Sequence, residues 1–384
     1  MTINKLQNYL LYAFMLTGIF ANYTNTYMIN NLFMILFILS SFLTKSMKPN
    51  SKIAYLYIAI AMIGVIDQVY YYMEGEFDFN SHYFTVPMIA LFLYAVNRIK
   101  LKFTFEDFIL ANTILLPILF LIGGMSEYKG RIDSEYITAN LKGIIPLFGF
   151  MVSAQNILKK KHVLVSFIVI LSSITFMIMS GSRQNLLFLL VGIFMLIYPI
   201  LKKKKYFKSN NLIKKTMIGS ILLVGGYFII STSLVHLSER FGGGIDTMIN
   251  KTVGSEQEYS ARERASFIET AINVATIYPI GVGRGNTKEV MLKYGSPLYK
   301  VTHNSHSLVA ELLINTGFIG IIFWLLIVYH LIKLMLNNRT RYIYGYIPLY
   351  FIIATFTSPL ISDKVFWVVL VILERQILKK GKTT

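Results

Sequence analysis

Residues 163–180 read VLVSFIVILSSITFMIMS, an unbroken apolar run without a charged side chain. Its length approaches the roughly 20 residues that an α-helix needs to cross the hydrocarbon core of a bilayer. We therefore predict an all-α polytopic membrane protein with about 12 transmembrane helices, because comparable runs recur along the whole chain. These runs lie near residues 6–21, 28–44, 53–72, 83–97, 108–124, 141–158, 163–180, 184–201, 215–235, 304–335, 342–360 and 363–378.

Composition supports the same class. The 384 residues are 55% hydrophobic and only 15% charged, and the mean hydropathy is +0.57, whereas a soluble chain of this length carries more charge. Cysteine is absent, which excludes disulfides and thiolate metal sites. No cleavable signal pattern precedes the first apolar run, so we expect that run to remain as an anchor.

The formal charge of +18 is explained by loops that collect lysine on the cytoplasmic side, and we expect no nucleic acid partner. With the amino terminus inside, basic residues fall in every second loop, while the facing loops are neutral, acidic or mixed. The orientation places both termini in the cytoplasm. The basic loops contain Lys45, Lys48 and Lys52; Arg98, Lys100 and Lys102; Lys159, Lys160 and Lys161; Lys202 to Lys205; and Lys333, Arg339 and Arg341.

This topology divides the chain into three parts. Residues 1–235 form transmembrane helices 1 to 9, residues 236–303 form one large extracytoplasmic loop with short helices, and residues 304–384 form transmembrane helices 10 to 12 and a cytoplasmic tail. The loop contains Arg240, Arg262, Arg264 and Arg284. Arginine binds phosphate or carboxylate through two parallel hydrogen bonds, so a loop rich in arginine indicates an anionic substrate at the outer surface.

Local sequence patterns give Arg183, Arg262 and Arg264 a more specific interpretation. Arg183 lies at an outer junction just before the apolar run 184–201, where a helix amino terminus favours an anion such as a diphosphate. The alternative is a helix cap with an arginine that reaches the interface. Ser260 and Glu263 fit a capping box. That box places Arg262 and Arg264 in a first helical turn, where cations are unfavourable unless an anion completes the site.

The alternative for Arg262 and Arg264 is pairing with nearby glutamates. The same pattern predicts an apolar stripe on the helix and an end at Pro279. The stripe consists of Ala265, Ile268, Ile272 and Ala275. Downstream, the glycines of Gly281–Asn286 lack the βαβ context of a dinucleotide site, and we predict a tight loop that approaches neighbouring backbone closely.

His303 and Asn304 lie where the chain becomes apolar again. A histidine at the start of an inward-running helix is kept neutral and can accept a proton from a hydroxyl; a structural interface histidine is the alternative. Glu311 lies eight residues later on roughly the same face, inside the predicted membrane, where an ionisable group is usually paired or functional. Two histidines, His303 and His306, without an acidic cluster do not form a metal site, so we expect neither metal nor cofactor.

Together these residues resemble the bacterial O-antigen ligase and polysaccharide polymerase superfamily. The sequence departs from the family pattern at Gln184 and His306. Either Arg262 or Arg264 corresponds to the second arginine of that pattern. The matching pieces, in chain order, are Ser182-Arg183, Arg262 before Ile277–Gly283, and His303-Asn304 before Ala310–Leu312 and Gly317–Gly320.

The resemblance implies a metal-independent glycosyltransferase in the bacterial cytoplasmic membrane. It would polymerise oligosaccharide repeat units linked to undecaprenyl pyrophosphate into capsular or O-antigen polysaccharide on the outer face. His303 would be catalytic, Arg183, Arg262, Arg264 and Arg284 would bind the diphosphate, and Asn304 and Glu311 would support them. A chain-length regulator and a flippase are candidate partners beside the bilayer. The alternatives are an O-antigen ligase and a lipid-linked oligosaccharide flippase or other transporter. Sugar identity, linkage, anomeric outcome and oligomeric state stay open.

Overall fold

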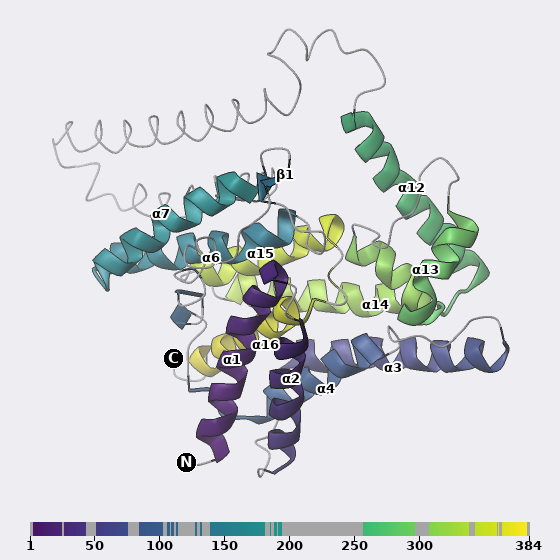
Figure 1. Ribbon diagram of the computed structural model, residues 1–384, viewed down its shortest axis with the longest axis horizontal. Helices are drawn as coiled ribbons and strands as arrows, with labels where there is room; N and C mark the ends of the chain where they lie inside the picture. The colour runs from purple at the N-terminus through teal and green to yellow at the C-terminus, as the bar shows by residue number, and fades with distance from the viewer. Residues whose placement is uncertain are drawn as a thin grey trace, which may run out of the picture. The chain divides into compact units, whose positions relative to one another are not determined.

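The computed structural model describes residues 3–24, 27–43, 51–75, 84–102, 139–180, 256–295, 307–337, 342–358 and 363–381, with isolated residues between 106 and 132, between 185 and 193, and at 360. This part of the chain is helical apart from a minimal antiparallel hairpin, β1 (Glu127–Tyr128) and β2 (Arg131–Ile132). The prediction of an all-α chain is therefore confirmed in its main feature. The helices are α1 (Ile3–Thr24), α2 (Tyr27–Phe42), α3 (Lys52–Met73), α4 (Thr85–Arg98), α6 (Ala139–Leu158), α7 (Val163–Ser180), α12 (Glu256–Ile277), α13 (Gly283–Tyr294), α14 (Leu308–Asn337), α15 (Tyr342–Thr357) and α16 (Lys364–Gly381) (Figure 1).

Two of the described helices, Lys52–Met73 in α3 and Leu308–Leu336 in α14, are long and apolar enough to cross a membrane. Shorter apolar segments include Met28–Phe42, Thr85–Arg98 and Tyr346–Phe356. Many large apolar side chains on α2, α3, α7 and α14 are exposed, which fits helices that face lipid. The full set of about 12 spans stays a prediction, since the run 215–235 lies outside the described residues.

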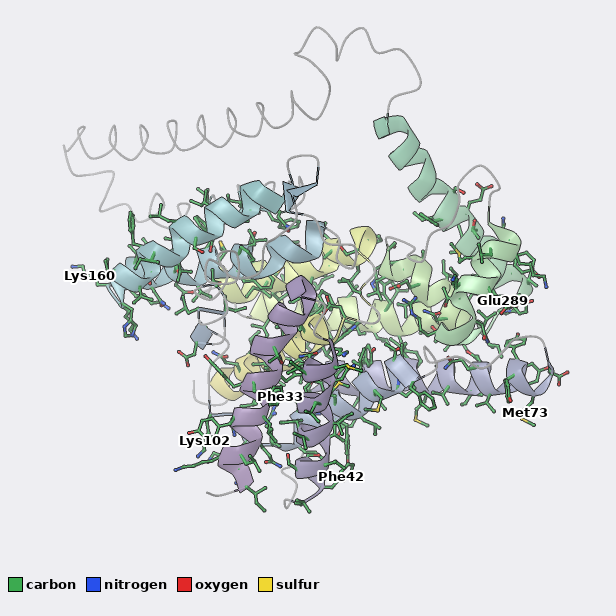
Figure 2. The ribbon with its side chains drawn as sticks, viewed as in Figure 1. Phe33, Phe42, Met73, Lys102, Lys160 and Glu289 are labelled. Carbon is green, nitrogen blue, oxygen red and sulfur yellow. The ribbon has the colours of Figure 1, made fainter. Side chains whose placement is uncertain are left out.

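The chain forms two compact units. One contains α6 and α7, which are antiparallel and joined by the turn Lys159–His162. Lys160 and Lys161 donate backbone hydrogen bonds to the carbonyls of Ile157 and Asn156, and Lys160 lies at the tip of this turn (Figure 2). The predicted apolar runs 141–158 and 163–180 are thus helices separated by the predicted lysine loop.

The other unit contains α1 to α4 and α12 to α16. At one end of it the buried carboxylate of Glu374 on α16 caps the first turn of α3. It accepts hydrogen bonds from the Ser51 hydroxyl at 2.5 Å and from the backbone N–H groups of Lys52 and Ile53 at 3.0 and 3.1 Å, and it pairs with His330 Nε2 at 2.5 Å. These bonds satisfy donors that a helix amino terminus otherwise leaves unpaired.

The same end of the unit contains further contacts between helix ends. Arg375 donates to the carbonyls of Val96 and Ile99 at the end of α4, and Asn8 bonds the backbone of Lys100 and Lys102. All of these groups belong to helix ends that the charge pattern assigns to the cytoplasm. Their common location agrees with the predicted alternation of spans; the side of the membrane that they face stays a prediction.

The Glu374 contacts give a first testable prediction. We expect Glu374→Gln to lower the stability by about 1–3 kcal/mol, because an amide nitrogen then faces one of the donors that the carboxylate oxygens now accept. The melting temperature in detergent should fall by several degrees when followed by tryptophan fluorescence; Trp367 is a reporter on the same helix. The matched control is Glu74→Gln at the exposed end of α3, which should leave the melting temperature unchanged. Equal melting temperatures for both variants would contradict a structural role of this carboxylate.

Candidate functional site

The site begins with the turn between α12 and α13. Pro279 follows the last turn of α12. Gly281 and Gly283 have φ angles of +94° and +76°, which residues other than glycine rarely adopt. A Cβ on Gly281 would lie 2.4 Å from the backbone nitrogen of Thr316, and one on Gly283 would lie 1.9 Å from Gln68 Cγ. The glycines therefore permit close backbone approach, as predicted. The predicted loop is shorter than expected, because Gly283–Asn286 already form the first turn of α13.

The turn contacts α14 where that helix is broken. Gly317 has φ 56° and ψ −149°, which interrupts the helical hydrogen bonding inside α14. Two hydrogen bonds join the break to the turn. Val282 N–H donates to the Ile314 carbonyl at 2.9 Å, and Phe318 N–H donates to the Pro279 carbonyl at 3.0 Å. The turn thus replaces partners that the broken helix cannot supply.

Polar side chains from α3 and α14 hold the start of α13. The side-chain oxygen of Gln68 accepts from Gly285 N–H at 2.8 Å, and the Thr287 hydroxyl donates to Asn315 Oδ1. Asn286 Nδ2 donates to the Val282 carbonyl at 2.7 Å, which fixes the turn itself. Gln68 and Asn315 are buried. The polar groups of this helix end are therefore paired with protein rather than with water.

Arg284 lies between these two contacts and pairs with Glu311. Arg284 NH1 lies 3.0 Å from Glu311 Oε1; the arginine side chain is 15% exposed and the glutamate side chain is fully buried. Tyr57, also buried, interacts electrostatically with both charged groups. A buried carboxylate is tolerated only with such a partner, so the pair fixes the position of the guanidinium.

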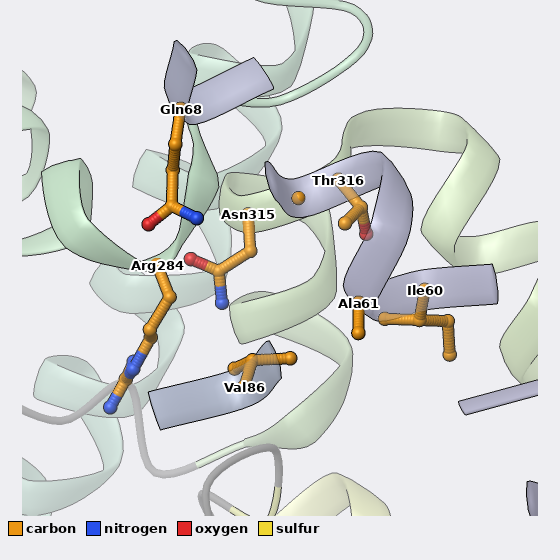
Figure 3. A pocket seen from close by; sticks show the side chains of 8 residues that line it. Ile60, Ala61, Gln68, Val86, Arg284, Asn315 and Thr316 are labelled. Atoms are coloured by element: carbon orange, nitrogen blue, oxygen red, sulfur yellow. The ribbon is translucent and has the colours of Figure 1, made fainter. Parts of the chain in front are cut away.

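A small cavity lies beside this pair (Figure 3). Gln68, Arg284 and Asn315 are among its polar lining residues, and it has room for about one water molecule. Among the described residues, Asn315 Nδ2 is buried without a hydrogen-bond partner. The remaining lining residues are Ile60, Ala61, Gly64, Val86 and Thr316. Asn315 therefore supplies one unpaired donor among the residues that line the cavity.

The predicted site residues are only partly located. Of them, Arg284 and Glu311 are brought together. Arg262 and Arg264 lie in α12, but their side chains lie outside the described residues, as do Arg183, His303 and Asn304 entirely. Whether the arginines and His303 meet in one site is therefore still a prediction.

One prediction for α12 is wrong. The helix already includes Glu256, so Ser260 lies inside it rather than at its cap, and Arg262 and Arg264 are not in the first turn. The residues before Ser260 include Glu256, Gln257 and Glu258, which are good helix formers and extend the helix upstream.

The predicted apolar stripe is not the buried face of α12. Of its members, Ala275 is buried but Ile268 and Ile272 are exposed. The buried face instead packs against Ala310, Leu313 and Ile314 of α14, and its α12 and turn residues are Phe267, Ala271, Val274, Ala275 and Tyr278. Aromatic bulk at Phe267 and Tyr278 decides which face meets α14.

Sequence reasoning also missed residues of the site. Tyr57, Gln68 and Asn315 are polar side chains inside predicted apolar runs. A polar residue inside a span is a usable signal, because it must find a partner there. Which partner it finds depends on the packing of α13, which the sequence does not specify.

The described residues contain no group of three or more His, Asp or Glu side chains placed to hold a metal ion. Activity without a metal is still a prediction.

Comparison with known proteins adds one finding. Residues 167–325 match the family model of the O-antigen ligase. No curated protein matches the chain. The matched segment contains most of α7, all of α12 and α13, and α14 as far as Leu325, so it includes Arg284, Glu311 and Asn315.

Proposed function

We propose that this chain polymerises oligosaccharide repeat units carried on undecaprenyl pyrophosphate, and the match of residues 167–325 to the O-antigen ligase family model supports the proposal. The product would be capsular or O-antigen polysaccharide, made on the outer face of the cytoplasmic membrane. The predicted resemblance is confirmed by the family match, which supports a membrane glycosyltransferase of O-antigen biosynthesis.

One observation carries the proposal within the structure. The Arg284–Glu311 pair lies inside the matched segment, and Arg284 lines a small cavity while Glu311 is in the first turn of α14. Ser307 Oγ lies 3.4 Å from Ala310 N, as a cap of the first turn of α14, and Glu311 lies one turn further on. His303 is four residues before Ser307, so its Cα lies within about 14 Å of that of Ser307. We propose that His303, on this short connection to α14, acts on the same substrate as Arg284.

The proposed reaction transfers a glycan between two oxygens. An acceptor hydroxyl attacks the anomeric carbon of the carrier-linked sugar and forms the new C–O bond. The bond to the pyrophosphate oxygen breaks, and the leaving pyrophosphate keeps the electron pair. His303 takes the hydroxyl proton. Arg284, with Arg183 and with Arg262 or Arg264, stabilises the charge that develops on the leaving group.

Two alternatives have support. The family description favours a ligase that transfers finished glycan to another acceptor. The break at Gly317 favours a transporter, because transporters bind substrates at broken helices near polar side chains. The family match favours glycan transfer over transport.

The test uses His303→Gln and Arg183→Lys in the native host. We expect each to lower polymer synthesis at least about tenfold, while lipid-linked single repeats accumulate on the outer face. The control is His162→Gln in the exposed turn after α6, which should make normal polymer. Accumulation on the inner face would indicate a flippase. Normal-length polymer that stays on the carrier would indicate a ligase. Normal polymer from both variants would overturn the proposed site.

A further inference from the structure

The turn between α12 and α13 lies below the ends of the helices that it contacts. The 22 residues of α3 span about 33 Å, close to the thickness of a hydrocarbon core of about 30 Å. Gln68, which bonds Gly285, lies about 8 Å inside the end of α3 at Met73. Ile314, which bonds Val282, lies about 9 Å inside the start of α14 at Leu308. The turn therefore lies about 8–9 Å below the ends of α3 and α14, which is within one leaflet of a hydrocarbon core about 30 Å thick.

The backbone of the turn meets the requirement for such a depth. Non-helical backbone is tolerated in the hydrocarbon region only where protein satisfies it. Gly281 N–H bonds the Tyr278 carbonyl at 2.8 Å, and the Pro279 and Val282 groups bond α14 across the Gly317 break. Gly281 and Val282 are buried. The turn and the irregular segment of α14 therefore supply hydrogen-bond partners to each other's backbone.

The outward face of this hairpin suits lipid. Residues 270–283 carry no charged side chain, and Arg284 at the bottom is paired with Glu311. The exposed charged side chains of the hairpin, Glu269, Lys288, Glu289 and Lys293, lie further from the turn on both limbs. Ile272 and Ile280 are 47% and 40% exposed, and Ile268 and Ile277 are exposed as well. Ile280 is next to Pro279, whose carbonyl bonds the nitrogen of the exposed Phe318 on α14. The isoleucine face is thus continuous with the apolar surface of a candidate span.

We propose that residues 266–294 form a re-entrant hairpin, which dips into one leaflet and returns to the same side. Its isoleucine face contacts the acyl chains of that leaflet, and its turn fills the break in α14. This accounts for the exposed stripe on α12, because isoleucines that face hydrocarbon need no protein partner. The hairpin also holds Arg284 below the level of the helix ends. The inference does not depend on the glycosyltransferase proposal.

The natural absence of cysteine permits a direct test. Single substitutions Ile272→Cys and Ile280→Cys are labelled with bimane, and the protein is reconstituted into phosphatidylcholine vesicles. Quenching is measured with lipids brominated on their acyl chains and with aqueous iodide. Leu325→Cys, 52% exposed on α14, is the lipid reference, and Glu74→Cys at the exposed end of α3 is the aqueous reference. Ile277→Cys replaces either test variant that fails to fold.

The expected result is quenching by brominated lipid at positions 272 and 280 to at least half the extent at position 325, with iodide quenching several-fold weaker than at position 74. Iodide quenching equal to that at position 74 would place the hairpin in water and overturn the proposal. Protection from both quenchers would also overturn it, because the isoleucine face would then be covered by protein.

Discussion

Replacing Gly317 with alanine is expected to destabilise the protein strongly, on the order of 3–5 kcal/mol. The φ and ψ angles of 56° and −149° lie in a region almost restricted to glycine. The added Cβ would lie 1.9 Å from the Pro279 carbonyl oxygen and 2.5 Å from its carbon, which are backbone atoms and cannot rotate away. Relief requires the hairpin to move, which breaks the bonds from Val282 and Phe318.

The measurement is the melting temperature in detergent, read from the fluorescence of Trp324 on α14. Gly64→Ala is the matched control. A Cβ on Gly64 meets only the Thr316 methyl at 3.6 Å, an ordinary contact, and Gly64 lies in the middle of α3. Alanine favours a helix over glycine there, so the control should be neutral or slightly stabilising. If Gly317→Ala melts at the temperature of Gly64→Ala, α14 is not broken at Gly317.

Much of the fold follows from apolar length and charge alternation. The predicted runs 53–72 and 163–180 correspond to α3 (Lys52–Met73) and α7 (Val163–Ser180) almost residue for residue. The reason is physical, since a span must satisfy its own backbone and bury no unpaired charge, and both requirements are local in sequence. The interruption at Gly317 was not predicted, because the polar and small residues Asn315–Gly317 lie inside a longer apolar run that is otherwise typical of one continuous helix.

The candidate site is less predictable because its contacts join distant segments. Residue type alone indicated that Glu311 needs a partner and that Arg284 binds an oxyanion. Their pairing depends on how α13 packs, and that is decided by Gln68 and Asn315 on other helices. The predicted helix start at Ser260 is wrong for a different reason. A capping box is a short pattern, and helix-forming residues upstream can override it.

The second large effect concerns the Arg284–Glu311 pair. We expect Arg284→Ala to cost about 3–5 kcal/mol, because it leaves the fully buried Glu311 carboxylate without its cation. Lys288→Ala, at an exposed position of the same helix, should cost less than about 0.5 kcal/mol. Removing both charges with Arg284→Met and Glu311→Leu should recover much of the stability, since replacing a buried pair by apolar groups is often neutral. A double variant as unstable as Arg284→Ala would contradict the pairing.

The double variant also separates structure from function. If Arg284 only neutralises Glu311, the variant without either charge should make polymer at a normal rate whenever it folds. If Arg284 also stabilises the leaving diphosphate, the folded double variant should lose at least about tenfold in polymer synthesis. Glu311→Leu alone frees the guanidinium but keeps it beside the cavity, so its rate of synthesis should fall less than that of the double variant. Equal rates for the double variant and the unmodified protein, at equal melting temperatures, would restrict Arg284 to a structural role.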